Sequence, residues 1–94
     1  MTFPDNLQKF LHALNNPNRQ RIILLFADQP MLTVGKVAEL TQLSMSTVSE
    51  HLKQLKEAGL LRSEKIGKEV EYRANVANIQ AILTELGSFL QRCC

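Results

Sequence analysis

Cysteine, tryptophan and long apolar runs are scarce or absent in this 94-residue sequence. The two cysteines are adjacent, at Cys93 and Cys94. Adjacent Cα atoms lie about 3.8 Å apart, below the usual disulfide range of about 4.4–6.8 Å, so the pair provides no disulfide framework. No run approaches the roughly 18–20 apolar residues that cross a bilayer. The first residues lack the basic segment and apolar core of a signal peptide, so we expect a cytoplasmic protein without membrane contact.

Motifs for catalysis are missing as well. His12 and His51 are far apart, and there is no glycine-rich phosphate loop, histidine-rich metal motif or nucleophile with an evident base. We therefore predict that the chain is not an enzyme and has no obligatory cofactor. The net charge is only +2, from 11 basic and 9 acidic residues. Binding to nucleic acid would therefore depend on which faces carry the charges, and on doubling by dimerisation.

Length and apolar content predict a small domain that pairs with a second copy. We assign residues 1–94 to a single domain, and a chain of this length buries only about 60–65% of its unfolded surface. Hydrophobic residues make up 45% of the sequence, which is rich for such a thin core. Part of this apolar surface is expected at a subunit interface, which predicts a homodimer.

Hydrophobic periodicity predicts a mainly α-helical fold. Helices are expected over residues 5–14, 17–27, 34–40, 45–58 and 76–92. The first and the last carry long apolar stripes, so we expect them to pack together and form the dimer face. The second contains the run Ile22–Phe26, which is apolar on every side and therefore predicts a central helix. Thr33 can cap the third helix and Ser44 the fourth.

The fourth predicted helix has two unlike faces. Val48, Leu52 and Leu55 recur with helical spacing and form a narrow apolar stripe. The opposite face carries short hydroxyl groups and other polar side chains. Such residues are poor helix formers, but they suit a helix that lies close to base edges and phosphates.

A charged β-hairpin is predicted after Gly59, which suits the residue that ends a helix. Its turn is expected near residues 66–68. Val70, Tyr72 and Ala74 are predicted to point inward, and Glu69, Glu71 and Arg73 outward. Helix, turn, polar helix and hairpin together predict a winged helix-turn-helix that reads double-stranded DNA.

Residues for DNA contact follow from this layout. The helical set is Ser44, mainly as a cap, with Ser46, Thr47, Ser49, His51, Lys53 and Gln54; the hairpin set is Lys65 and Lys68. Simpler interpretations stay open: His51 can be a structural histidine, and the hairpin charges can be solubilising groups paired with glutamates. Arg19 and Arg21 are expected to anchor the second helix, by salt bridge or phosphate contact, rather than to read bases.

Over about residues 8–75 the chain resembles the ArsR family of bacterial metalloregulatory repressors. The resemblance is carried by residues 13–22, 34–40, 43–53 and 55–61, including the patterns Val-Ser-x-His-Leu and Leu-x-x-Ala-Gly-Leu. It implies a winged-helix homodimer that binds an inverted-repeat operator and releases it when an inducer binds.

The resemblance also bears on the inducer site. The family's thiolate site has Cys-x-Cys where this chain has Thr33 to Gly35, and its zinc site uses Asp and His, which residues 76–92 lack. Some arsenic-responsive members carry an adjacent cysteine pair near the end of the last helix, usually with a third cysteine. Cys93 and Cys94 are thus the predicted metal ligands, with As(III) or another thiophilic metal as inducer. A cysteine of the second subunit could complete the site.

Alternatives remain for the thiols and for the whole chain. Cys93 and Cys94 could sense an oxidant or reactive sulfur, or be a terminal pair without function. A winged-helix protein-interaction module is the alternative from another class, and it predicts a larger exposed apolar patch on the polar helix or the hairpin.

Overall fold

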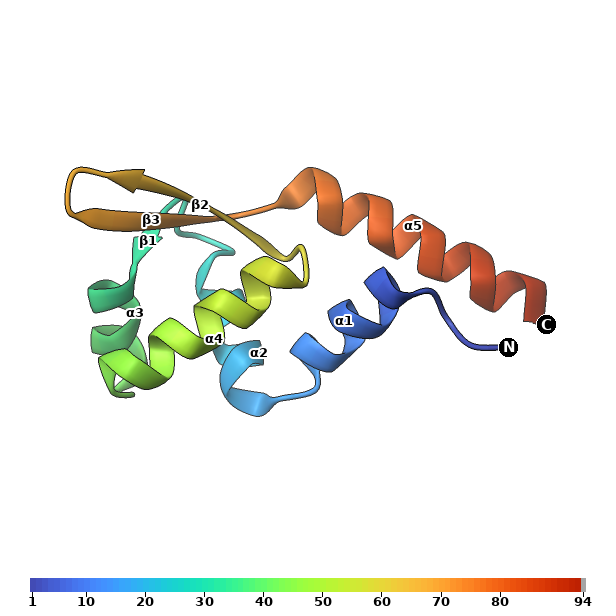
Figure 1. The fold of residues 1–94 in the computed structure, drawn as a ribbon, viewed down its shortest axis with the longest axis horizontal. Helices are drawn as coiled ribbons and strands as arrows, with labels where there is room; N and C mark the ends of the chain where they lie inside the picture. Colours follow the sequence, from blue (N-terminus) through green and yellow to red (C-terminus); the bar gives the residue numbers. More distant parts are fainter. Residues whose placement is uncertain (94) are drawn as a thin grey trace.

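A computed structural model describes residues 1–93, with the backbone alone for Cys93 (Figure 1). Its elements are α1 (Asp5–Leu14), α2 (Pro17–Leu25), β1 (Leu32–Thr33), α3 (Val34–Thr41), α4 (Met45–Glu57), β2 (Leu61–Ile66), β3 (Glu69–Ala74) and α5 (Val76–Cys93). All five predicted helices are confirmed, with ends within two residues of the prediction. The mainly helical winged helix-turn-helix is therefore confirmed. No helix in the described part of the chain is long and apolar enough to cross a membrane.

The sheet has one strand more than the sequence predicted. The hairpin of β2 and β3 is confirmed, with Ser63 opposite Tyr72 and a turn at Gly67, whose φ is +63°. The short strand β1 adds to the other edge of β3, giving the antiparallel order β1-β3-β2. A strand of two residues is too short to show the alternation of apolar and polar side chains. Its pairing uses backbone atoms, so the sequence pattern gave no signal for β1.

Both ends of α4 are fixed by local hydrogen bonds. Ser44 is the predicted cap, because its Oγ accepts from the backbone N–H of Thr47 at 3.2 Å. At the other end Gly59 has φ +85°, its N–H donates to the Lys56 carbonyl, and the N–H of Leu60 donates to the Leu55 carbonyl. This pair of bonds is a Schellman motif, and it confirms the predicted helix end at Gly59.

The core lies between α4 and its neighbours α1, α2, α3 and β2. Val48, Leu52 and Leu55 are each 0% exposed, so the predicted apolar stripe of α4 is buried along its length. The prediction of a central α2 is correct only in part. This helix contacts α1, α3 and α4, and Ile22 is 0% exposed, but Leu24 is 69% exposed, so the apolar run is not buried on every side.

The inward and outward sides of β3 also differ from the prediction. Tyr72 and Ala74 pack against the core as expected, whereas Val70 does not belong to it. Glu71 was predicted to point to solvent, but only 18% of its side chain is exposed, and it pairs with Arg73 at 3.6 Å. The added strand β1 pairs with this part of β3, with Thr33 opposite Glu71.

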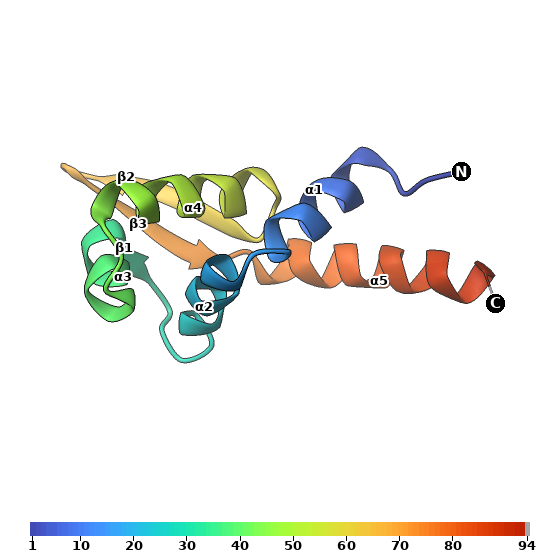
Figure 2. The same ribbon diagram turned by 90° about the horizontal axis from the view of Figure 1, so that it is seen from below.

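The last helix, α5, extends away from the body and runs alongside α1 (Figures 1 and 2). Asn6 donates a hydrogen bond to Glu85 at 3.2 Å, and the rings of Phe3 and Phe89 meet edge to face with centroids 5.9 Å apart. The predicted packing of the first and last helices is therefore confirmed within one chain. The molecule is elongated as a result, with extents of 46 × 23 × 22 Å.

A hydrogen bond joins the beginning of α5 to the end of α4. The side-chain amide of Asn78 donates from Nδ2 to the Gly59 carbonyl at 2.9 Å. A Cβ atom on Gly59 would overlap Asn78 Nδ2, whereas one on Gly67 would meet open space. Gly59 is thus required twice, for its positive φ and for this close approach.

These two glycines allow a matched test of that contact. Both Gly59→Ala and Gly67→Ala place a side chain in the left-handed region, which costs roughly 1–2 kcal/mol. Gly59→Ala also displaces Asn78, so we expect it to lower the free energy of unfolding by about 1 kcal/mol more than Gly67→Ala. Urea unfolding at one fixed protein concentration measures both variants. Equal losses would show that the Asn78 contact contributes nothing to stability.

Candidate nucleic-acid interface

Burial of the apolar stripe leaves the polar face of α4 exposed to solvent. Ser46, Thr47, Ser49 and Lys53 are exposed, and Gln54 is half-buried. At the first turn the Ser44 hydroxyl donates to Thr47 Oγ1 at 2.9 Å and lies 3.3 Å from Ser46 Oγ. The hydroxyl groups of these three residues therefore form one cluster at the start of α4. A helix-turn-helix directs such donors and acceptors at base edges.

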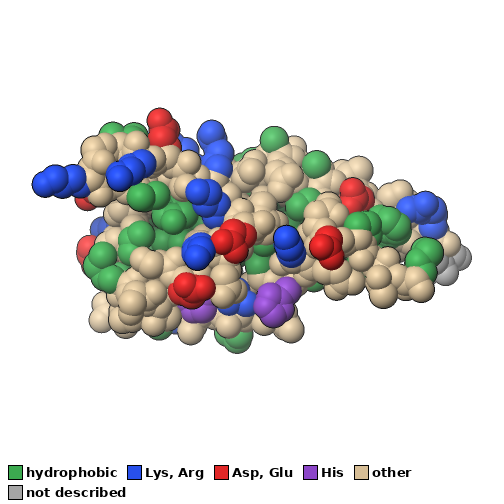
Figure 3. Space-filling view, viewed as in Figure 1, with side chains coloured by type: hydrophobic (Ala, Val, Ile, Leu, Met, Phe, Trp, Pro, Cys, Tyr) green, Lys and Arg blue, Asp and Glu red, His purple; other side chains and the backbone are tan. Residues whose placement is uncertain are grey.

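A shallow groove brings this face of α4 together with the hairpin. It is lined by Thr33, Val34, Gly35, Met45, Ser49, Lys68, Glu69 and Val70. Hydrophobic side chains are visible between the hairpin and α4 in Figure 3. Ser49 of the helical set and Lys68 of the hairpin set thus line one surface.

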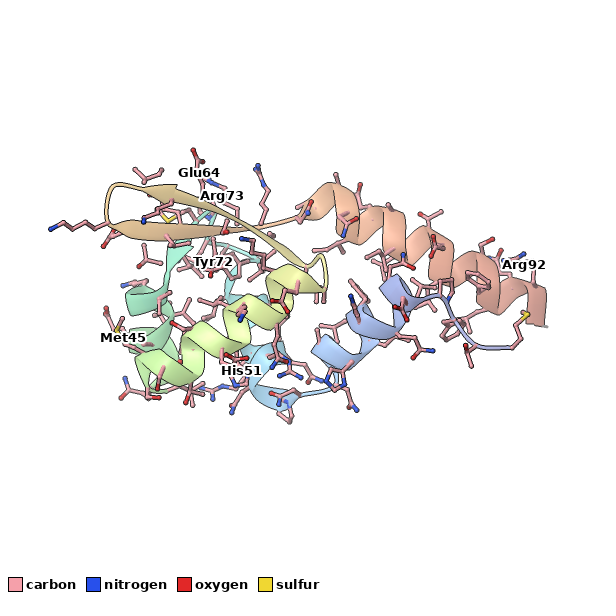
Figure 4. All side chains as sticks on the ribbon, viewed as in Figure 1. Met45, His51, Glu64, Tyr72, Arg73 and Arg92 are labelled. Carbon is pink, nitrogen blue, oxygen red and sulfur yellow. The ribbon has the colours of Figure 1, made fainter. Side chains whose placement is uncertain are left out.

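Met45 is a member of this surface that the sequence did not identify. It occupies the first position of α4 and is 56% exposed (Figure 4). Its apolar side chain lines the groove together with Ser49 and Lys68, where an apolar group can contact a thymine methyl. The only sequence signal was a large hydrophobic residue off the stripe of Val48, Leu52 and Leu55.

The hairpin charges divide into two groups. Arg73 pairs with Glu71 and donates to the Pro30 carbonyl at 3.4 Å. For this residue the alternative of a charge paired with a glutamate is correct. Lys65 and Lys68 are exposed near the tip, and neither forms an ion pair with any residue that the structure describes. Their charges are thus available to a polyanion.

A buried arginine joins α1, α2 and α4. Arg19 is 6% exposed; its Nε donates to the Ala13 carbonyl at 2.7 Å and its Nη2 to the His12 carbonyl at 3.2 Å. Its Nη1 lies 3.5 Å from Nδ1 of His51, on the side of α4 that faces α2 (Figure 4). Burial, and then the positive charge of Arg19, lower the pKa of His51 from 6.5, while Glu50 acts in the opposite direction.

The predicted anchoring of α2 by arginines is confirmed, although the partners differ from those expected. Arg21 donates to Asn18 Oδ1 at 3.2 Å and to the Thr41 carbonyl at 3.1 Å, so it ties α2 to the end of α3. Both Arg19 and Arg21 use backbone carbonyls rather than carboxylates. Periodicity does not indicate such partners, because a carbonyl is present at every residue.

The predicted metal ligands are Cys93 and Cys94. Cys93 is the last residue of α5 and its side chain is not described, and Cys94 lies outside the described residues. Within the described part, no three His, Cys, Asp or Glu side chains gather as a metal site would require. Next to this end of the helix, the Arg92 guanidinium carbon stacks 4.6 Å above the Phe89 ring.

The sequence that forms this surface matches a family of known proteins. The family model for bacterial regulatory proteins of the arsR family matches residues 16–63, which span α2, α3, α4 and the first residues of β2. The regulator YgaV of Escherichia coli is 28% identical over 81% of this chain and 77% of its own length. The cadmium resistance regulatory protein CadC of Listeria innocua is 35% identical over 83% of this chain, which spans 65% of CadC.

A solved structure agrees with the fold over most of the chain. The homodimeric winged helix-turn-helix DNA-binding domain of Mb0332 from Mycobacterium bovis matches with a TM-score of 0.72 and 29% identity. The match covers 89% of this chain and 80% of that one.

The environment of His51 predicts a pH-dependent stability. Because the pKa is lowered in the folded state, the unfolded chain binds more protons between pH 6.5 and that lower value. The free energy of unfolding should therefore fall as pH drops below 6.5, with no contribution from His51 above it. Urea unfolding at about pH 7.5 and about pH 5.5 would measure the fall, and His51→Gln should reduce it. An equal fall in that variant would assign the effect to other groups.

Proposed function

The chain belongs to the ArsR family of bacterial regulatory proteins and is a DNA-binding transcriptional regulator; we propose that it is a cytoplasmic repressor whose homodimer binds an inverted-repeat operator. A thiol-binding inducer, As(III) or a similar soft metal, releases it. The observation that carries the DNA-binding part is the row of exposed hydroxyl groups on α4, of which Ser49 lines one groove with Lys68 of the hairpin. Relatives described as transcription regulators favour this function over catalysis or a protein-interaction module.

Two kinds of DNA contact are assigned to different elements. The first half of α4, with Ser46, Thr47, Ser49 and His51, lies in the major groove and reads base edges. Lys65 and Lys68 at the hairpin tip contact flanking phosphate, where each cation contributes affinity without sequence information. Ser44 mainly caps α4, and Lys53 and Gln54 lie at the margin of the contact.

Replacing each kind of residue should separate these roles. Ser46→Ala with Thr47→Ala should reduce discrimination between operator and random DNA, by roughly 1–3 kcal/mol per lost base contact. Lys68→Ala should instead weaken both DNAs alike and reduce the salt slope of binding by about one to two units per dimer. Fluorescence anisotropy over a salt series measures both effects. Base reading by α4 would be refuted if all variants lost the same affinity on operator and random DNA.

Dimerisation is proposed through the apolar residues that α1 and α5 leave exposed. Leu11, Val76, Leu83 and Leu90 are 36%, 57%, 52% and 50% exposed. A two-fold axis beside α5 would bury them against their copies, as isologous interfaces do. The two copies of α4 would then reach half-sites roughly 34 Å apart, one turn of DNA.

An interface of this kind can be tested with two matched leucines. Leu83→Glu should convert the dimer to a monomer at micromolar concentration, because it places a carboxylate against the partner's apolar face. Leu24→Glu is the control, since Leu24 is 69% exposed on α2, away from α5. Sedimentation velocity distinguishes the two states. A wild-type monomer, or a Leu83→Glu dimer, contradicts the proposed interface.

Inducer sensing is proposed for Cys93 and Cys94, at the end of α5. Soft ions bind thiolates tightly and displace their protons, so a cysteine pair at a subunit interface suits As(III) or Cd(II). Release of DNA requires only that the ion prefer one of two dimer arrangements, and 1–3 kcal/mol corresponds to about 5–150-fold in affinity. A route toward α4 exists in the bond from Asn78 to Gly59.

A double variant tests the thiols directly. Cys93→Ser with Cys94→Ser should still bind operator DNA, because α5 ends far from the first turn of α4, but As(III) should no longer release it. Labelled operator with and without As(III), Cd(II) and a polysulfide measures release, always beside the reduced wild type. Release of the wild type by polysulfide alone would favour a reactive-sulfur sensor. Release of the double variant by As(III) would exclude these cysteines as its sensor.

A further inference from the structure

Arg19 of α2 contacts His51 of α4, one of the residues that we propose to contact DNA. Nδ1 of His51 lies 3.5 Å from Nη1 of Arg19. We propose that Arg19 is a positioning residue that fixes the tautomer of His51, so that α4 presents His51 Nε2–H as a hydrogen-bond donor to the DNA. This inference depends on the proposed DNA-binding function, and it states that His51 is the donor in its contact with DNA.

Arginine can only donate hydrogen bonds. A guanidinium group has five N–H donors, no acceptor, and stays charged at every relevant pH. The ring atom that faces it must therefore offer a lone pair. In a neutral imidazole only one nitrogen is unprotonated, so a lone pair on Nδ1 places the proton on Nε2.

Arg19 holds its position independently of His51. Two of its nitrogens donate to the carbonyls of Ala13 and His12 at the end of α1, and the side chain is 6% exposed. The guanidinium is thus fixed by backbone atoms before His51 is considered. Lysine could not replace it, because a single ammonium on a flexible stem cannot reproduce this planar set of donors.

The surroundings also favour the neutral ring. His51 is half-buried; the charge of Arg19 on α2 acts against protonation of its ring, and that of Glu50 on α4 acts in the opposite direction. Both burial and the guanidinium disfavour the imidazolium. His51 therefore carries one ring proton near neutral pH. The nitrogen that holds this proton is the donor, and the other nitrogen is the acceptor.

The consequence concerns which DNA atoms can pair with His51. With Nδ1 directed at α2, Nε2 is the nitrogen left for the DNA. An N–H there pairs with phosphate oxygens, guanine O6 or N7, or thymine O4, whereas the opposite tautomer would pair with the amino groups of cytosine or adenine. Arg19 thus excludes amino groups as partners at this position without touching the DNA.

Nitrogen NMR of the free protein tests the tautomer itself. We expect wild-type His51 to show a protonated Nε2 and an unprotonated Nδ1 at about pH 7.5. Arg19→Met should give a mixture of tautomers. Arg21→Met is the matched control, because Arg21 also bonds a carbonyl from α2 but does not contact His51. A wild-type ring protonated at Nδ1 overturns the proposal.

Two substitutions of His51 test the contact to DNA. The glutamine amide nitrogen can take the place of Nε2, and the asparagine amide nitrogen takes the place of Nδ1. On an operator selected from random duplexes, His51→Gln should bind within about threefold of wild type and His51→Asn about tenfold more weakly per half-site. Equal losses in the two variants overturn the proposal, provided circular dichroism shows both to be folded.

Random duplex DNA identifies the acceptor. An equal loss for His51→Asn on random and operator DNA assigns the acceptor to phosphate, and a loss on the operator alone assigns it to a base. Both results support the donor. If wild type bound no duplex at all, the proposed function would fail, while the NMR measurement would still decide whether Arg19 fixes the tautomer. If Arg19→Met does not fold, the wild-type spectrum and the two His51 variants still decide.

Discussion

The rotation of α4 about its own axis is the constraint on which the rest of the interface depends. Val48, Leu52 and Leu55 are completely buried, and a turn of the helix would expose them to water. Burying three such side chains contributes roughly 1.5–3 kcal/mol each, far more than any polar contact on the other face. The core therefore orients the hydroxyl groups, and the polar residues are free to be chosen for recognition rather than for stability.

Polar contacts then fix the position of α4 relative to the neighbouring elements. Arg19 joins the end of α1 to the middle of α4, Arg21 joins α2 to the end of α3, and Asn78 joins α5 to the end of α4. Each ends on at least one backbone carbonyl, which cannot change with side-chain substitution. The hydrophobic core determines which face of α4 is outside, while these contacts determine where α4 lies relative to its neighbours.

The sequence carried the parts of this arrangement that are local. The stripe of α4, the cap at Ser44 and the stop at Gly59 each depend on residues within one or two turns, so periodicity and residue type predicted them. The exposure of Leu24 was not predictable, because it depends on which neighbours α2 meets. The pair of Arg19 and His51 was missed for a similar reason, since a contact between residues distant in the chain exists only after folding.

The pairing of the sheet has a mechanical consequence for the hairpin. Strand β1 contacts β3 only at Glu71 and Tyr72, and Thr33 of β1 is also the cap of α3. The hairpin is thus joined at its base to the helix-turn-helix, while the tip from Lys65 to Val70 is a two-stranded ribbon that β1 does not reach. Two strands alone are only marginally stable, so the tip of the hairpin bends more easily than its three-stranded base. It can follow the local width of a DNA groove while the register of α4 stays unchanged.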